Sequence, residues 1–329
     1  MPLTTKLTEL LGIRHPVLLA PMGGASGGAL AAAVSEAGGL GLIAGAYGDP
    51  DWLEAEFQRA GSRRVGVGFI TWSLAKRPDL LDLALARRPA AVMLSFGDPA
   101  PFAAAVKDAG ARLICQIQTR AQAEQAAQAG ADVIVAQGGE AGGHGRSRGT
   151  LALVPAVVDA VAPLPVVAAG GIADGRGLAA ALMLGAVGAL LGTRFYAAEE
   201  CLAHPAAKRR VVTAGGDETV RTTVFDIVRA LDWPAYYTGR AIGNDFSRRW
   251  HGKEGDLARA AGDERPRYAA AAAAGDFDTA VVFAGECVDL IDAVEPAGRI
   301  LERVVAEAEA RLRDVAELAV QAAAAAGAR

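Results

Sequence analysis

The chain has 329 residues, of which 52% are hydrophobic and 21% are charged, and this composition excludes global disorder because a large core can form. The formal net charge of −4 argues against a surface that binds nucleic acid or an anionic membrane. The cysteines Cys115, Cys201 and Cys287 lie far apart, which favours neither a disulfide framework nor a zinc site, so we expect small buried hydrophobes in a reducing compartment.

The sequence carries no targeting or membrane-spanning segment that we recognise. The start, "MPLTTKLTELLGIRHPV", lacks the basic and apolar regions of a signal peptide. The most apolar stretch, around residues 178–191, is shorter than the ~20 residues that a transmembrane helix needs. We therefore expect a cytoplasmic protein with no membrane or nucleic-acid partner.

Eight short apolar runs alternate with alanine-rich amphipathic segments in the first 195 residues. An apolar run between two helices is typical of a parallel strand buried on both faces. The predicted strands cover residues 17–20, 41–44, 65–70, 91–95, 112–117, 132–136, 165–169 and 189–192. The predicted helices cover residues 28–37, 51–60, 99–109, 120–129, 153–161 and 175–184.

Eight βα units indicate a closed (β/α)8 TIM barrel over residues 1–195, with a doubly wound open sheet as the alternative. Glycines and polar residues follow many different predicted strands, as they do in the loops at the top of a barrel. A doubly wound sheet would concentrate them at one switch point. The distribution therefore favours the barrel.

The amino-acid composition of the sequence changes after Phe195. Residues 196–285 are more polar, contain several aromatic residues and carry turn signals. We expect a small, mainly helical second domain there that covers the mouth of the barrel. Residues 286–329 have the composition of a long helix and are expected to pack back on the barrel.

Glycine-rich loops follow several predicted strands. The loop "APMGGASGG" (20–28) comes after the first strand, and its glycines allow a flat ligand to approach the main chain, although an ordinary turn would look similar. The loop "GGEAGGHGRSRG" (138–149) follows the sixth strand and surrounds Glu140 and His144 with glycines. A histidine in such a loop can serve as a general base, or it can bond loop carbonyls. Arg146 and Arg148 either bind an anion or remain solvated.

Two further loops predict a phosphate site. They are "AAGGIADG" (168–175), after the seventh strand, and "LLGTRF" (190–195), around the end of the eighth. Barrel enzymes often bind phosphate through main-chain N–H groups in these two loops. Gly170, Gly171, Gly192 and Thr193 occupy the corresponding positions, and the Thr193 hydroxyl adds a donor. No Walker-type, HExxH, Gly-x-Ser-x-Gly or early GxGxxG motif competes with this interpretation.

Together these pieces resemble the nitronate monooxygenase (2-nitropropane dioxygenase) family and its relatives, the flavin-type enoyl-acyl-carrier-protein reductases. The similar pieces are "APMGGAS", "CQIQT", "AQGGEAGGHGR", "AAGGIADGRGLAAALMLGA" and "LLGTRF", in the family's order and spacing. The resemblance covers most of the chain. It implies an FMN-dependent TIM barrel with a small helical domain over the active site.

The resemblance also implies roles for individual residues. His144 corresponds to the family's catalytic histidine. By this resemblance, the isoalloxazine ring of FMN would lie along Ala20, Pro21 and Met22. The ribityl chain or the ring edge would contact Gln116 and Gln137, with Gly138 nearby. The phosphate would be held by Gly170, Gly171, Gly192 and Thr193. Three positions depart from the family pattern: Gly68 stands where many members carry Asn, Gln116 where many carry Lys, and Gln137 where many carry Asp.

The resulting hypothesis is oxidation of alkyl nitronates, and of nitroalkanes, by FMN and O2 to a carbonyl compound and nitrite. The alternative is an NAD(P)H-dependent flavin reductase that acts on enoyl thioesters or quinones. An inosine-monophosphate-dehydrogenase-type barrel would need a cysteine in a glycine-rich loop, and none of the three cysteines lies in one. A non-catalytic binding protein is disfavoured because His144 stands between glycines in a loop at the predicted barrel mouth. The expected partners are a small-molecule substrate and O2, and a homodimer is left open.

Overall fold

The computed structural model describes residues 3–327, with side chains as far as Gln321. Its largest element is a sheet of eight parallel strands whose bounds agree with the predicted runs to within two residues. The strands are β1 (Val17–Leu19), β2 (Leu42–Ala46), β3 (Gly66–Ile70), β4 (Ala91–Ser95), β5 (Arg112–Ile117), β6 (Val133–Gln137), β8 (Val166–Ala169) and β9 (Ala189–Leu191).

The sheet closes into a barrel. Its strand order is β1-β9-β8-β6-β5-β4-β3-β2, so the two ends of the series are β1 and β2. A parallel bridge joins Leu18 of β1 to Leu40 just before β2, and Leu40 N donates to Val17 O at 3.1 Å. A doubly wound sheet would leave two open edges. The predicted (β/α)8 TIM barrel is therefore confirmed.

The barrel interior is filled by side chains from alternate strand positions. Leu18, Met93 and Val135 are buried inside, together with other apolar residues of the strands. Leu7 and Leu11 of α1 (Lys6–Leu11) belong to the same cluster and are fully buried. Because α1 lies against the segment that precedes β9, it closes the end of the barrel at which the strands begin. The opposite end is left for a site.

A ring of helices surrounds the barrel. The side chains of Asp49, Thr119 and Asp174 each accept a hydrogen bond from the N–H three residues later and begin three of them. The ring consists of α2 (Gly28–Glu36), α3 (Pro50–Ala60), α5 (Asp79–Ala86), α6 (Ala100–Asp108), α7 (Arg120–Gln128), α8 (Thr150–Val161) and α9 (Gly175–Met183). The prediction lacked α5 and the four-residue helices α4 (Thr71–Leu74) and α10 (Thr193–Tyr196), which are too short for a readable periodicity.

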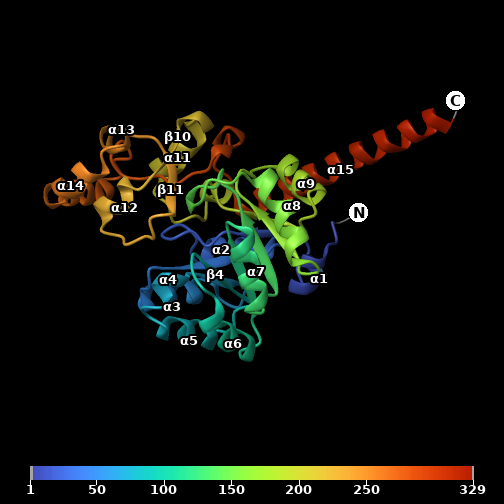
Figure 1. Cartoon of the computed structure of the whole chain (residues 1–329), viewed down its shortest axis with the longest axis horizontal. Helices are drawn as coiled ribbons and strands as arrows, with labels where there is room; N and C mark the ends of the chain where they lie inside the picture. Colours follow the sequence, from blue (N-terminus) through green and yellow to red (C-terminus); the bar gives the residue numbers. More distant parts are fainter. Residues whose placement is uncertain (1–2, 328–329) are drawn as a thin grey trace.

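The region that follows is mainly helical and lies beside the mouth of the barrel (Figure 1). Its elements are α11 (Pro205–Thr213), η1 (Gly216–Glu218), β10 (Thr219–Thr222), α12 (Val224–Arg229), β11 (Thr238–Ile242), α13 (Asp245–Trp250), α14 (Glu254–Ala274) and η2 (Glu286–Leu290). The expectation did not include a sheet, but β10, β11 and β7 (Gly143–Gly145) form one, in the order β10-β11-β7. We call it the small sheet. Its strand β7 belongs to the loop after β6.

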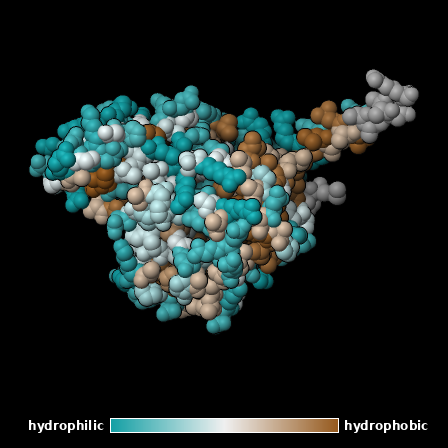
Figure 2. Space-filling view, viewed as in Figure 1, coloured by the Kyte–Doolittle hydropathy of each residue, from teal (hydrophilic) through white to brown (hydrophobic). Residues whose placement is uncertain are grey.

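The last helix, α15 (Ala297–Gly327), packs against α2 and α9. Ile300 and Val304 are buried there, and the Glu307 carboxylate accepts a hydrogen bond from Gly175 N at 2.9 Å. The helix then extends away from the body of the molecule (Figure 1), and apolar side chains lie on the extended part (Figure 2). Leu318 and Val320 are 65% and 69% exposed. Among residues 3–327, no helix has both the length and the apolar composition that a membrane span requires.

The three cysteines are free and buried, as the sequence predicted. Burial raises the pKa of the Cys115 thiol to about 12 and that of the Cys287 thiol to about 11. Neither thiol is therefore a ready nucleophile at neutral pH.

Candidate active site

The loop after β6 crosses the end of the barrel at which the strands finish, and its glutamate holds it in place. The Glu140 carboxylate accepts hydrogen bonds from Thr150 N at 2.9 Å and from Thr150 Oγ1 at 2.8 Å, at the start of α8. A Cβ on Gly142 would lie 2.6 Å from the carbonyl carbon of Ala284. At Gly142, therefore, the glycine is needed because the loop packs closely against the chain before η2.

His144 is positioned by the small sheet. It lies on β7, which pairs antiparallel with β11, and Gly239 stands directly opposite. A Cβ on Gly239 would lie 2.8 Å from the Phe283 ring and 3.6 Å from His144 Nε2. The glycine therefore leaves room for both rings on this face of the sheet.

The imidazole of His144 forms a buried pair with Asp226 of α12. His144 Nε2 lies 2.9 Å and 3.0 Å from the two carboxylate oxygens, and the two side chains are only 7% and 6% exposed. Because a carboxylate only accepts, Nε2 carries the hydrogen in the neutral ring and Nδ1 carries the basic lone pair. Within residues 3–327, no protein group hydrogen bonds to Nδ1. A base whose second nitrogen is held by a carboxylate is an arrangement suited to proton transfer.

An indole covers one face of this imidazole. The rings of Trp233 and His144 are stacked, with centroids 3.5 Å apart and planes at 4°. Trp72 and Phe96 contact the indole edge-on at 5.4 Å and 5.1 Å, and Trp233 Nε1 donates to the Tyr47 hydroxyl at 3.0 Å. The loop between α12 and β11 thereby contacts the segments that follow β2, β3 and β4, and the segment after β3 is the helix α4. Phe96 has φ of +64°, a costly conformation of the kind that clusters at functional sites.

Three glutamines join the barrel to the histidine loop. Gln137, at the end of β6, donates through Nε2 to the carbonyl oxygen of His144 at 3.1 Å. Its Oε1 accepts from Gln116 at 3.2 Å and from Gln118 at 2.7 Å. Gln118 Oε1 is buried without a hydrogen-bond partner in the described chain. Such an orphaned acceptor fits a donor supplied by a ligand or water.

The loop after β1 brings Pro21 against Gly68 of β3. A Cβ on Gly68 would lie 2.3 Å from Pro21 Cγ. Ser26 holds the loop in this position, since its hydroxyl donates to Ala20 O at 2.8 Å and accepts from Met22 N at 3.2 Å. The glycine at position 68, which departs from the family pattern, therefore has a packing reason.

Replacing Gly68 by alanine is expected to destabilise the protein by about 1–3 kcal/mol, because the added methyl group must displace the Pro21 ring. The free energy of unfolding in urea measures this loss. The matched control is Gly262→Ala on α14, where a Cβ would meet no atom within 4 Å. A helical Gly→Ala change of that kind should stabilise by up to about 1 kcal/mol. Equal stability of the Gly68→Ala variant and the parent would contradict the packing argument.

The loops after β8 and β9 present main-chain donors. Gly170 and Gly171 have φ of +98° and +73°, which only glycine adopts easily. In the described chain, the N–H groups of Gly171, Ile172 and Gly192 donate to no protein acceptor. Such open N–H groups fit an oxyanion such as phosphate. The Thr193 hydroxyl accepts from Gly285 N at 3.0 Å and so ties this end of the barrel to the chain before η2.

The two arginines of the histidine loop have different surroundings. The Arg146 guanidinium lies over the Tyr236 ring, 4.5 Å from its centroid. Arg148 is exposed and donates to Ala152 O of α8 at 2.8 Å. Neither arginine contacts His144 through a hydrogen bond described in the structure.

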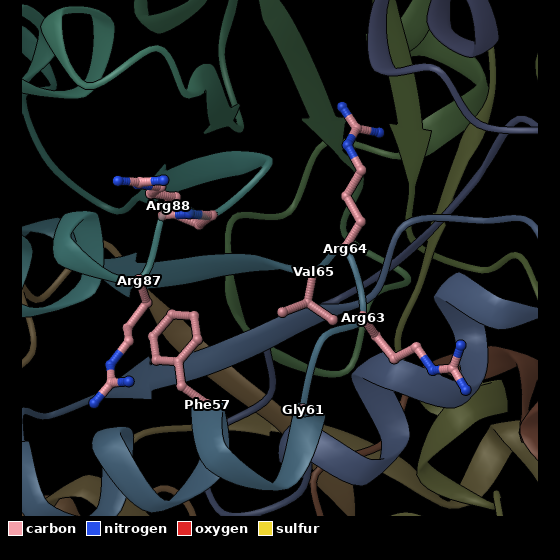
Figure 3. A pocket seen from close by; sticks show the side chains of 8 residues that line it. Phe57, Gly61, Arg63, Arg64, Val65, Arg87 and Arg88 are labelled. Atoms are coloured by element: carbon pink, nitrogen blue, oxygen red, sulfur yellow. The ribbon is translucent and has the colours of Figure 1, made fainter.

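A separate hollow of about 200 Å³ lies at the opposite end of the barrel (Figure 3). Arg63, Arg64, Arg87 and Arg88 line it, and their side chains point in different directions. Val65, between them, directly precedes β3, so the hollow lies where strands begin. Residues at that end of a barrel usually serve stability rather than chemistry. We assign the candidate active site to the other end.

The structure brings the predicted residues to that end, and it adds others that the sequence did not single out. Asp226, Trp233 and Gln118 touch His144 or its glutamine partner. Gln118 lies inside the "CQIQT" motif, so the sequence could have pointed to it as a site residue. Asp226 and Trp233 lie in a polar segment more than 80 residues after His144, and only the fold shows that they meet it.

Comparisons with known proteins identify similar sequences and similar folds. A family model described as nitronate monooxygenase matches residues 4–63 and 76–307. Nitronate monooxygenase npaC of Metarhizium robertsii is 35% identical over 335 residues, which cover 91% of this chain and 92% of that protein. Among solved structures, FabK from Thermotoga maritima has a TM-score of 0.84 at 31% identity, covering 96% of this chain and 99% of that one. Nitroalkane oxidase from Streptomyces ansochromogenes has a TM-score of 0.79 at 33% identity, covering 93% and 99%.

Another similar relative carries a different name. A (3aS,4S,5R,7aS)-5-hydroxy-7a-methyl-1-oxo-octahydro-1H-indene-4-carboxyl-CoA dehydrogenase of Mycobacterium tuberculosis is 41% identical over 231 residues, 69% of this chain. The match spans 65% of that relative, and 64% of its counterpart in Rhodococcus jostii.

Proposed function

Because the chain belongs to the nitronate monooxygenase family and is an oxidoreductase of that type, we propose that it oxidises alkyl nitronates, and nitroalkanes, with FMN and O2 to a carbonyl compound and nitrite. The observation that carries the proposal is the buried His144–Asp226 pair, whose Nδ1 is left without a protein partner in the described chain. It lies at the end of the barrel where main-chain donors are also open.

The residues at the mouth fit a flavin mononucleotide. The open N–H groups of Gly171, Ile172 and Gly192, with the neighbouring Gly170 and Thr193, would hold its phosphate. Bound FMN would supply the one-electron redox chemistry that oxidation by O2 requires.

The remaining FMN contacts come from the loops after β1, β5 and β6. Ala20, Pro21 and Met22 would lie along the ring system. Gln116 and Gln137, whose side chains are hydrogen bonded to each other, would contact the ribityl chain or the ring edge near Gly138. The orphaned Oε1 of Gln118 supports this assignment, because it faces no protein donor in the described residues.

The chain's own part in the chemistry is to move a proton and to hold the substrate. His144 Nδ1 would remove the α-proton from a neutral nitroalkane, and the protonated ring would donate a hydrogen bond to the nitro oxygens of a nitronate. Asp226 keeps Nε2 protonated and stabilises the positive charge that forms on the ring. Trp233 fixes the plane of the ring and excludes water from one of its faces.

The first test is the visible spectrum of the purified protein under anaerobic conditions. Addition of propyl-2-nitronate alone is expected to bleach the flavin absorbance, with NADH and NADPH as parallel additions. Bleaching by a pyridine nucleotide while the nitronate stays inert would contradict the proposal. A colourless protein that takes up no added FMN would show that FMN is not the cofactor.

A second candidate is redox chemistry on an enoyl or acyl thioester. Two observations favour it: the 41% identity to a carboxyl-CoA dehydrogenase and the similarity to FabK over nearly the whole chain. The apolar wall made by Trp72, Phe96 and Trp233 suits an acyl chain as well as a short nitroalkane. Bleaching by an acyl-CoA, or reoxidation of the reduced protein by an enoyl-CoA, would favour this candidate.

A further inference from the structure

Two arginines stand side by side on the small sheet, and only one of them has a counter-charge. Arg221 of β10 is the register partner of Arg240 of β11, and both donate through Nε to the carbonyl oxygen of Gly139, at 3.3 Å and 3.0 Å. Arg240 also forms an ion pair of 2.7 Å with Glu286. Among the ion pairs of the described residues, Arg221 has none.

The other donors of Arg221 meet neutral groups or nothing. Its Nη1 donates to Thr238 O at 2.6 Å and to Gly145 O at 3.3 Å. Its Nη2 is buried and meets no acceptor in the described part of the chain. A Cβ on Gly145 would lie 2.9 Å from Nη2 and 3.2 Å from Gln137 Oε1, which places the free donor beside the end of β6.

Arg221 is a cation without a directly paired counter-ion among the described residues, although the carboxylates of Glu286 and Glu140 act on it from further away and raise its pKa. Burial, and next the charge of Arg240, lower the pKa of Arg221 from 12.5 to about 10. The side chain stays charged at neutral pH. Arg221 is partly buried, and a partly buried charge without a paired counter-ion has a free-energy cost that is relieved when an anion binds.

The small sheet separates this donor from the catalytic histidine. Successive side chains on a strand point to opposite faces, so the Cβ direction of Gly145, toward Arg221, is opposite to that of His144. Arg221 therefore lies on the face that covers the glycine-rich loop. The main-chain oxygen of Gly138 in that loop would be 2.9 Å from a Cβ on Gly170. Gly170 belongs to the proposed phosphate cradle, by which we mean Gly170, Gly171, Ile172, Gly192 and Thr193.

We propose that Arg221 binds a phosphate ester of a ligand held at the barrel mouth, on the face of the small sheet away from His144. The inference rests on the proposed function, because it takes the mouth to hold a phosphate-bearing cofactor. A guanidinium offers parallel N–H donors that match phosphate oxygens, whereas the cradle itself contributes only neutral donors. The phosphate is either that of FMN or the pyrophosphate of a second ligand such as NADPH or coenzyme A.

The test begins with two flavins that differ only in the phosphate group. Flavin fluorescence titrations measure the Kd of FMN and of riboflavin, which lacks the phosphate, for the parent, Arg221→Met and Arg240→Met. The flavin-loaded proteins are then titrated with NADPH and coenzyme A by calorimetry. Arg221→Met is expected to weaken one phosphate ligand by about 10- to 100-fold while riboflavin changes less than about twofold. Arg240→Met is the matched control, since Arg240 shares the sheet and the Gly139 contact but has its own carboxylate.

Each outcome bears on the proposal. A selective loss of FMN affinity assigns the site to the cofactor phosphate, and a selective loss of NADPH or coenzyme A affinity assigns it to a second ligand. Unchanged affinity for all of them, parallel losses of FMN and riboflavin, or the same loss in Arg240→Met would overturn it. If Arg221→Met does not fold, Arg221→Lys, which keeps the charge without the fork, gives the same comparison. A parent protein that binds neither flavin defeats the cofactor proposal, and the NADPH and coenzyme A titrations then decide the role of Arg221.

Discussion

Replacing His144 by alanine is expected to reduce kcat/KM for a neutral nitroalkane by roughly 10²- to 10⁴-fold, the usual contribution of a positioned general base. The change removes the nitrogen that takes the α-proton, whereas the phosphate cradle and the glutamine cluster remain. The Kd of FMN should therefore stay within a few-fold of the parent value. Steady-state kinetics with nitroethane and fluorescence titration with FMN measure the two quantities.

The nitronate serves as an internal comparison for this variant. A nitronate has already lost its α-proton, so its oxidation should decrease less than that of the nitroalkane. His144→Asn retains a polar side chain without basicity and guards against effects of the cavity beneath Trp233. His251→Ala, on an exposed residue, is the control for histidine loss in general. Undiminished nitroalkane turnover in both His144 variants would refute the assigned role.

Asp226→Asn is expected to lower kcat/KM for the nitroalkane by roughly 10²-fold. Asparagine has almost the same shape and can still accept a hydrogen bond from His144 Nε2, but it removes the negative charge that stabilises the protonated ring. Oxidation of the preformed nitronate should change by less than about fivefold, because that substrate needs no proton removal. The ratio of the two rates thus reports the function of the carboxylate rather than its contribution to folding.

Matched variants separate positioning from a general disturbance of the loop. Asp232→Asn makes the same chemical change at an exposed position six residues further along, and it should leave both rates unchanged. Asp226→Glu restores the charge and should recover part of the nitroalkane activity. Equal losses on both substrates would show that Asp226 serves only to hold the fold.

The barrel was predictable because its signals are local. Each strand is a short apolar run whose boundary lies at glycine, proline or a charged residue, and some of the helices begin at a capping residue such as Thr119 or Asp174. The predicted strand bounds consequently agree with the structure to within two residues. The closed order of the strands followed from their number and from the spread of glycine-rich loops.

The partners of His144 were not predictable in the same way. His144 meets Asp226 across 82 residues and pairs with Gly239 across a sheet that no alternating pattern announced. The three-residue strand β7, "GHG", has no β-propensity of its own and exists only because β11 offers it a partner. Nothing in the sequence indicated that Gly142 is needed for close contact with the chain before η2.

The small sheet contains one strand from the barrel's own loop and two from the region that follows the barrel. The pairing of His144 with Asp226 therefore depends on two parts of the chain, the loop after β6 and the region that follows the barrel. If the added region opens locally, His144 loses its strand partner and Asp226 at the same moment, while the barrel keeps its core. Catalytic competence should then disappear on mild heating or in dilute denaturant before the barrel melts. In evolutionary terms, sequence changes in that region can alter the surroundings of His144 while the strands of the barrel stay the same.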